Sequence, residues 1–147
     1  MDSQKGFVRT FTVEEANRLL PFLEAALHKI AGLKMRMKQL DRDMETLYEI
    51  WGEELLQEAN IDNKLYRQSM EKKQAAALSI KAEIGAISSH GCIVKDLDKG
   101  LVDFYYDRSG ELVFLCWKRG ETGISHWHPL SSGSVSRRPL EELAVKG

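Results

Sequence analysis

A long repeat of apolar residues at seven-residue spacing restricts this chain more than any other feature of its sequence. A single register runs from Ala16 to Trp51. One core position holds Ala16, Leu23, Ile30, Met37, Met44 and Trp51, and the other holds Leu19, Ala26, Leu33, Leu40 and Leu47. This spacing places both sets on one face of an α-helix. Thr12 and Glu15 have the spacing of a capping box, which predicts that the helix begins there.

A proline and a short polar segment divide the helical region. Pro21 lacks an amide N–H and clashes with the preceding turn, so we expect a kink or a break near Leu20. Apolar residues at three- and four-residue steps from Tyr66 to Ile87 predict a second helix of about 27 residues. The segment EANIDN between them contains a helix stop and a new start. We therefore expect an antiparallel helical hairpin.

The pattern changes after Gly91 from helical spacing to short segments rich in branched and aromatic residues. CIVKDL, LVDFYYD, ELVFLCWK and TGISHWH are separated by the turn sequences DLDKG, DRSG and KRGE. They predict an antiparallel β-meander of three or four strands, after which the tail begins as a loop. The expected fold is α+β: a helical hairpin at 1–90, kinked near Pro21, and a meander with a C-terminal tail at 91–147. We expect the two to form one cooperative unit.

Charge and apolar patterning exclude several classes of protein. The net charge of −1 provides no field that attracts nucleic acid or anionic membranes. No apolar run approaches the roughly 20 residues that span a bilayer. The N-terminal residues lack the pattern of a secretion signal, and the two cysteines favour reduced thiols over a disulfide. We therefore expect a cytoplasmic protein without a nucleic-acid or membrane partner.

Two histidines and a cysteine are the first candidates for a site. His126 and His128 fall on the same face of a strand, because side chains alternate along it. Cys116 on the preceding strand could join them on a metal ion, with His90 or Cys92 completing a zinc set. Because no CxxC pair or HExxH helix is present, we predict no metal and no other cofactor. His126, His128 and Cys116 remain the alternative metal set.

Asp103 is a second candidate, because it lies within the apolar strand GLVDFYY. A buried carboxylate requires a partner, and we expect Arg137 or Arg138 to provide it. No nucleophile elbow, phosphate loop or dinucleotide motif is present, so the sequence does not favour an enzyme.

Two blocks of sequence resemble a known family. FTVEEANRLLP and GLVDF…LCW…GE…WHPL…RRPL are similar to a bacterial and archaeal family described as domain of unknown function 2203. The resemblance implies the architecture but no catalytic role, since the family has no assigned activity. It omits His90, Cys92 and His126, which disfavours a zinc site. The residues that it shares are Asp103, Cys116, Trp117, Gly120, Glu121, Trp127, His128, Arg138 and Pro139.

This set suggests a polar ligand site in which Trp117 and Trp127 form the walls. The polar members are Asp103, Glu121, His128 and Arg138. A structural pair of Asp103 with Arg138 explains the same residues equally well.

The apolar stripe carries our leading expectation for function. Leu20, Leu27 and Tyr48 widen the stripe beyond a narrow two-helix seam, and the Ala-rich second helix cannot cover it. We therefore expect a non-enzymatic interaction protein that forms a homo-oligomer through its helices, or binds a helical protein partner. A small-ligand or metal-binding module is the alternative.

Overall fold

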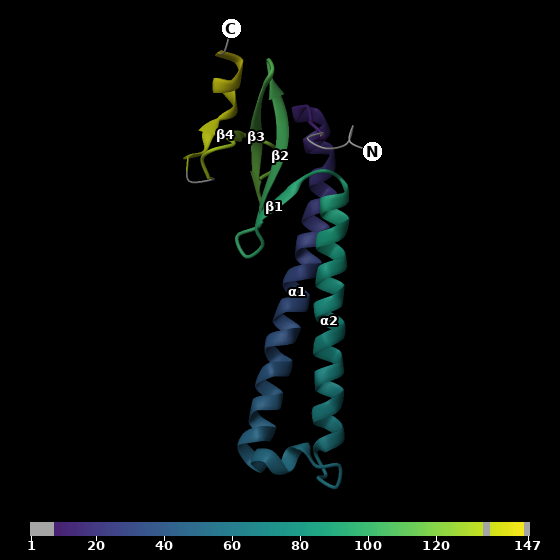
Figure 1. The fold of residues 1–147 in the computed structure, drawn as a ribbon. Coiled ribbons are helices and arrows are strands. Elements are labelled where there is room, and N and C mark those ends of the chain that lie inside the picture. The colour runs from purple at the N-terminus through teal and green to yellow at the C-terminus, as the bar shows by residue number, and fades with distance from the viewer. Residues whose placement is uncertain (1–7, 134–135, 146–147) are drawn as a thin grey trace. The chain divides into compact units, whose positions relative to one another are not determined.

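The computed structural model describes residues 8–133 and 136–145, and it has the expected α+β architecture (Figure 1). Two long helices precede a small antiparallel sheet. The elements are α1 (Val13–Trp51), η2 (Gly52–Leu56), α2 (Asn63–Ser89), β1 (Ile93–Asp96), β2 (Leu101–Arg108), β3 (Glu111–Lys118), β4 (His126–Pro129), β5 (Arg138–Pro139) and η4 (Leu140–Val145).

The packing divides the chain into two compact units. The first, here called the sheet unit, comprises Met1–Leu27 and Ile84–Gly147, and the second, the hairpin unit, comprises His28–Glu83. The boundary expected from the sequence, between the helical hairpin and the meander, lay after residue 90. The first turns of α1 and the last turns of α2 therefore pack with the sheet.

The start of α1 follows the capping prediction. The Thr12 amide donates to Glu15 Oε1 at 2.8 Å, and the Glu15 amide donates to Thr12 Oγ1 at 3.0 Å. The helix then continues through Pro21 without a break, so the break allowed for near Leu20 does not occur. Pro21 is exposed, whereas Leu20 and Leu23 are buried. Burial of each leucine contributes about 1.5 to 3 kcal/mol, which offsets a proline penalty of about 3 kcal/mol.

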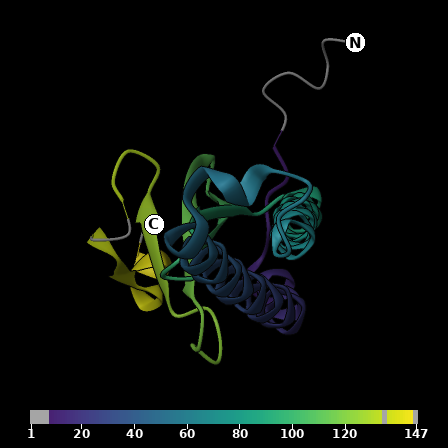
Figure 2. The same ribbon diagram turned by 90° about the horizontal axis from the view of Figure 1, so that it is seen from below.

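The hairpin unit contains the antiparallel pair of helices that the sequence predicts. Figures 1 and 2 both show α1 and α2 side by side. Lys29 Nζ lies 2.9 Å from Glu83 Oε2, and Lys73 Nζ lies 2.7 Å from Asp41 Oδ1, so these pairs mark the register of the two helices. At the closed end, Asn63 Nδ2 donates to the Leu55 carbonyl at 2.9 Å. Ile30, Leu40, Leu55 and Ala76 are buried within this unit.

The sheet is a meander in the order β1-β2-β3-β4-β5, with antiparallel neighbours throughout. The fifth strand was not expected. Arg138 pairs with Trp127 and Pro139 pairs with His126, so part of the expected loop extends the sheet. Two residues are too few to show a strand periodicity in sequence.

Alternation along the strands creates two faces with different composition. Phe104 packs edge-on against Phe11 at 5.2 Å between ring centroids, so its face turns toward the start of α1. The Phe11 amide donates to the Tyr105 carbonyl at 2.8 Å, and the Ile124 amide donates to Asn17 Oδ1 at 2.8 Å. These bonds fasten the first turns of α1 to the sheet. The opposite face carries the polar residues described next.

Candidate functional site

A buried carboxylate and a buried imidazole form the centre of the polar face. His128 Nε2 lies 3.0 Å from Asp103 Oδ2, and both side chains are no more than 2% exposed. His128 Nδ1 lies 2.9 Å from the Pro129 carbonyl oxygen. Because a carbonyl only accepts hydrogen bonds, Nδ1 carries a proton. A second proton lies between Nε2 and the carboxyl group, since one of the two must donate.

The environment of Asp103 disfavours its charge. Burial raises the pKa of this carboxyl above its ordinary value, although the charge and hydrogen bond of His128 oppose the shift. Among the described residues, Asp103 Oδ1 is buried without a hydrogen bond of normal geometry, although the Cys116 thiol interacts with the same carboxyl group. Such an atom normally costs about 1 to 3 kcal/mol, so its position requires a reason.

Cys116 lies directly opposite Asp103 in the β2–β3 register. Burial and the neighbouring Asp103 carboxylate raise the pKa of its thiol to about 12, against the opposing effect of Arg137. The thiol is therefore protonated at neutral pH, which excludes a ready thiolate nucleophile. One ligand atom from each of Asp103, Cys116 and His128 can be chosen so that all lie within 4.8 Å of one another.

Glu121 and Arg137 form a second polar cluster next to the first. Arg137 Nη2 donates to both carboxylate oxygens of Glu121, at 2.8 and 2.9 Å. Burial alone raises the pKa of Glu121, but the hydrogen bonds from Arg137 and the Lys118 amide outweigh it, and the net shift is downward. His126 Nδ1 lies 4.0 Å from Glu121 Oε2. The alternative metal set is thus divided: His126 lies beside Glu121, and Asp103 takes its place near Cys116 and His128.

The expected pairing of Asp103 with Arg137 or Arg138 is wrong, and the β5 register gives the reason. Arg138 pairs with Trp127, whose face is opposite that of Asp103. Its guanidinium lies 5.1 Å from the Trp127 ring centroid, and its side chain is exposed. Arg137 pairs instead with Glu121.

The two tryptophans also lie away from the Asp103–His128 pair. Trp117 and Trp127 alternate onto the face of Phe104 and are fully buried there. Trp117 Nε1 donates to the Glu121 carbonyl at 2.9 Å, which shapes the β3–β4 turn. They support the sheet from the other side and do not line a cleft over the pair.

A pocket of about 240 Å³ reaches Asp103 and His128 from the surface. Its lysines and Ser132 carry no local signal in the sequence. Lys95 lies in β1, Lys99 in the β1–β2 turn and Ser132 in the loop after β4, and only the fold brings them together. Lys95 Nζ also lies 4.7 Å from the centroid of Phe114. The lining residues are Lys95, Asp96, Lys99, Leu101, Asp103, His128, Ser132 and Gly133.

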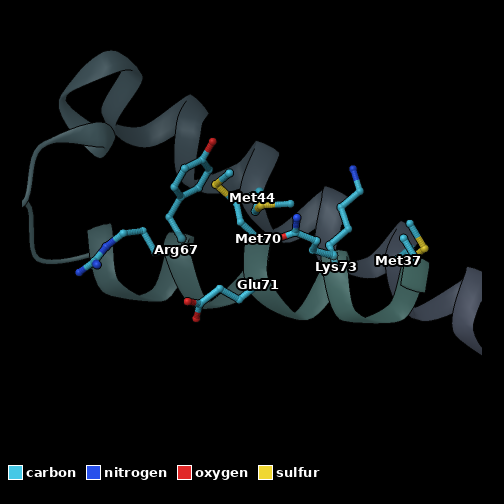
Figure 3. A pocket seen from close by; sticks show the side chains of 9 residues that line it. Met37, Met44, Arg67, Met70, Glu71 and Lys73 are labelled. Atoms are coloured by element: carbon cyan, nitrogen blue, oxygen red, sulfur yellow. The ribbon is translucent and has the colours of Figure 1, made fainter. Parts of the chain in front are cut away.

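A second pocket, of about 660 Å³, lies between the helices of the hairpin unit (Figure 3). Its apolar lining combines Met37 and Met44 of α1 with Met70 of α2. Arg67 and Glu71 project from the same side of α2. The complete lining is Met37, Met44, Tyr66, Arg67, Met70, Glu71, Lys73, Gln74 and Ala77.

Comparison with known proteins supports the resemblance seen in the sequence. None of the helices that the structure describes is both long and apolar enough to span a bilayer. Neither the curated proteins nor the solved structures include a match to the chain. The family model DUF2203, described as "Uncharacterized conserved protein", matches residues 9–140, which include both helices, all five strands and the polar cluster. The chain therefore belongs to the DUF2203 family.

Proposed function

We propose that this protein is an interaction module that associates with a second copy of itself through the hairpin unit. One observation carries the proposal. Eight of the nine exposed large apolar side chains in the described part of the chain lie between residues 28 and 83. They are Met35, Tyr48, Ile50, Leu56, Ile61, Leu65, Met70 and Leu78, and Leu130 is the ninth.

The amount of exposed apolar surface supports association over a solvated helical pair. Met35 is 72% exposed and Ile61 is 83% exposed, values that place nearly whole apolar side chains in water. Isolated exposed apolar residues are ordinary, but concentration on one unit is typical of an interface. A helical partner of a different sequence would use the same surface.

The charges next to the apolar pocket favour a second copy as the occupant. Arg67 and Glu71 lie one turn apart on α2, with Met70 between them in sequence. In a two-fold dimer with antiparallel α2 helices, Arg67 of each copy would face Glu71 of the other. The Arg67–Glu71 ion pair would then form twice, and the methionines of the pocket would lie between the two pairs. It therefore predicts both a partner and an orientation.

Sedimentation equilibrium at micromolar concentration tests this proposal. We expect a dimer or higher oligomer, and a species of only 16.7 kDa would contradict it. Glu71→Arg places like charges in both symmetric contacts and should weaken association on the order of tenfold, from two pairs of about 0.5 to 1 kcal/mol each. The double variant Arg67→Glu, Glu71→Arg should restore it.

The matched control reverses a charge outside the hairpin unit. Arg18 and Glu14 form an exposed pair with the same i, i+4 spacing, at 3.6 Å. Arg18→Glu should leave association unchanged. If it weakens association as much as Glu71→Arg does, a general charge effect explains the data and the α2 interface is wrong.

Binding of a small ligand at the sheet is a second candidate function. It is favoured by the buried Asp103 Oδ1, which makes no hydrogen bond of normal geometry, next to the pocket that reaches His128. Of the four polar residues that the sequence suggested, Asp103 and His128 belong to this pocket, while Glu121 pairs with Arg137. A thermal-shift screen tests it: a ligand should stabilise the native chain but not the His128→Ala variant.

We also propose that the protein acts in the cytoplasm. Cys92 and Cys116 are both buried free thiols, which suits a reducing compartment. The net charge of −1 gives no reason to expect a nucleic-acid partner. Fractionation of cells that express a tagged chain tests the location.

A further inference from the structure

We propose that Asp103, Cys116 and His128 bind a divalent transition-metal ion of the zinc type. This inference names the ligand class for the second candidate function and is independent of self-association. It also differs from the metal set that the sequence suggested, because Asp103 replaces His126. The fold brings the three residues together from β2, β3 and β4.

The donor atoms match the preferences of zinc. A cysteine sulfur, an imidazole nitrogen and a carboxylate oxygen are its three common protein ligands, at about 2.0 to 2.3 Å from the ion. Such lengths place ligand atoms about 3 to 4 Å apart in a tetrahedral site. The atoms here lie within 4.8 Å of one another, so small side-chain movements close the set around an ion.

Two hydrogen-bonding features point to a missing ligand. Asp103 Oδ1 is buried and makes no hydrogen bond of normal geometry in the described part of the chain, although the Cys116 thiol lies close enough to interact with this carboxyl group. His128 Nδ1 donates to the Pro129 carbonyl, which orients the ring and leaves Nε2 facing the cluster. A metal-bound histidine commonly has this arrangement, with one nitrogen on the ion and the other on a backbone carbonyl. An ion would replace the direct contact between Nε2 and Asp103.

Charge balance favours a divalent ion in this buried place. Asp103 and Cys116 supply one negative charge each when they coordinate, and His128 binds as a neutral ring. The total cancels the charge of the ion, so the loaded site contains no net charge to bury. The thiol proton and the proton between Asp103 and His128 leave to water.

The pocket next to the cluster supplies access and a fourth position. It reaches Asp103 and His128 and has a volume of about 240 Å³, which is room for water or a small anion. Lys95 and Lys99 also line it. Three protein ligands with one open position are typical of zinc sites that take an exchangeable ligand, whereas purely structural sites are closed.

Cobalt titration of the full-length chain tests the proposal. Protein freed of metal with a chelator is titrated with Co²⁺ and then with Zn²⁺. We expect one ion per chain, visible d–d bands of tetrahedral cobalt, and a thiolate-to-cobalt charge-transfer band that Zn²⁺ abolishes. Cys116→Ala should remove the charge-transfer band. His128→Ala should weaken binding at least tenfold.

Two nearby residues provide matched controls. Cys92 is also a buried free thiol, but it contacts the Ile87 carbonyl at 3.3 Å outside the cluster. His126 shares the strand and face of His128 and lies beside Glu121. Cys92→Ala and His126→Ala should leave the spectrum and the affinity unchanged. Loss of the charge-transfer band in Cys92→Ala, with Cys116→Ala unaffected, would overturn the assignment.

The decisive measurement uses the native chain, so it does not depend on whether a variant folds. Absence of the charge-transfer band and of stoichiometric Co²⁺ or Zn²⁺ in the folded native protein overturns the metal site. If inorganic phosphate then stabilises the native chain but not a folded His128→Ala variant, the ligand function stands without the metal. If neither metal nor any screened ligand acts, both ideas fail together. Circular dichroism establishes folding in each case.

Discussion

Asp103 and His128 each depend on the other for burial. The carboxyl has a raised pKa through desolvation, and the imidazole provides the hydrogen bond to Oδ2. Removal of one partner leaves the other as a buried polar group that has lost its hydrogen bond. Such deletions cost more than the net value of the bond that is lost.

His128→Ala in metal-free protein should therefore lower the free energy of unfolding by about 1 to 3 kcal/mol. Asp103→Asn should cost less, since an amide can still form a hydrogen bond with Nε2. Urea unfolding followed by far-ultraviolet circular dichroism measures both, with His126→Ala as the control. Native or raised stability in His128→Ala would mean that the pair serves binding at the expense of stability.

Glu121 predicts a pH dependence of stability. Its folded pKa lies below the ordinary value of 4.5, so its pairing with Arg137 stabilises the fold above that pH. The contribution is lost as the pH falls from 4.5 through the folded pKa. Glu121→Gln should make the unfolding free energy less dependent on pH in this window, measured by urea titrations at several acidic pH values. Equal slopes in both proteins would contradict the prediction.

The sequence suggested that Asp103 and His128 belong to one polar site, but it paired Asp103 with an arginine and not with His128. A carboxylate within an apolar strand is visible locally, and its need for a partner follows from electrostatics. The choice of partner depends on strand register and on which face each residue occupies. Arg138 appeared suitable by charge, yet β5 pairs it with Trp127 on the other face. Sequence spacing contained no information on that register.

The helices were easier to predict than the fifth strand because their signals are local. The capping residues Thr12 and Glu15 are three positions apart, and the second helix has the expected 27 residues. β2 and β3 likewise follow a local alternation of apolar residues. β5 exists only through pairing with β4. The 240 Å³ pocket also depends on distant segments, which explains why Lys95 and Lys99 were missed.

Two glycines at turns of the sheet differ in what surrounds them. Gly100 has φ +70°, and a Cβ there would lie 2.6 Å from Arg119 Cβ. Gly110 has φ +91°, with nothing within 4 Å of the same position. The positive φ of both residues is unfavourable for any residue with a Cβ. Of the two, only Gly100 would also bring that Cβ into collision with Arg119 Cβ.

Gly110→Ala should therefore cost about 1 to 2 kcal/mol of stability from its backbone conformation alone. Gly100→Ala should cost more, because Arg119 or the turn must also move. Thermal and urea unfolding compare the two variants. An equal loss in both would show that the turn at Gly100 relaxes without cost.

The division into two units predicts that the hairpin unit can be shortened. Lys29–Glu83 and Lys73–Asp41 define an antiparallel register in which residues 34 and 79 lie on facing turns. Replacement of residues 34–79 by a short Gly–Ser loop keeps the Lys29–Glu83 pair and leaves the sheet unit's core intact. The shortened chain should fold and, without most of the exposed apolar residues, should sediment as a monomer.

Tryptophan fluorescence provides the measurement for this variant. Trp51 is removed with the deleted segment, so the signal comes from Trp117 and Trp127 alone. Both are buried in the sheet unit and should retain a cooperative urea transition. A chain without such a transition would show that the sheet unit requires the hairpin unit.

The discontinuity of the sheet unit has a consequence for the order of events on the ribosome. The hairpin unit is continuous from residue 28 to 83, so its helices can pair as soon as they leave the exit tunnel. The first turns of α1 are made before it, yet the Phe11 amide bonds to Tyr105 and Asn17 accepts a bond from Ile124. Phe11 and Asn17 therefore remain without their sheet partners until β2 and the β3–β4 segment have been synthesised. The start of α1 is thus the part of the chain that waits longest during translation for the segments that it finally contacts.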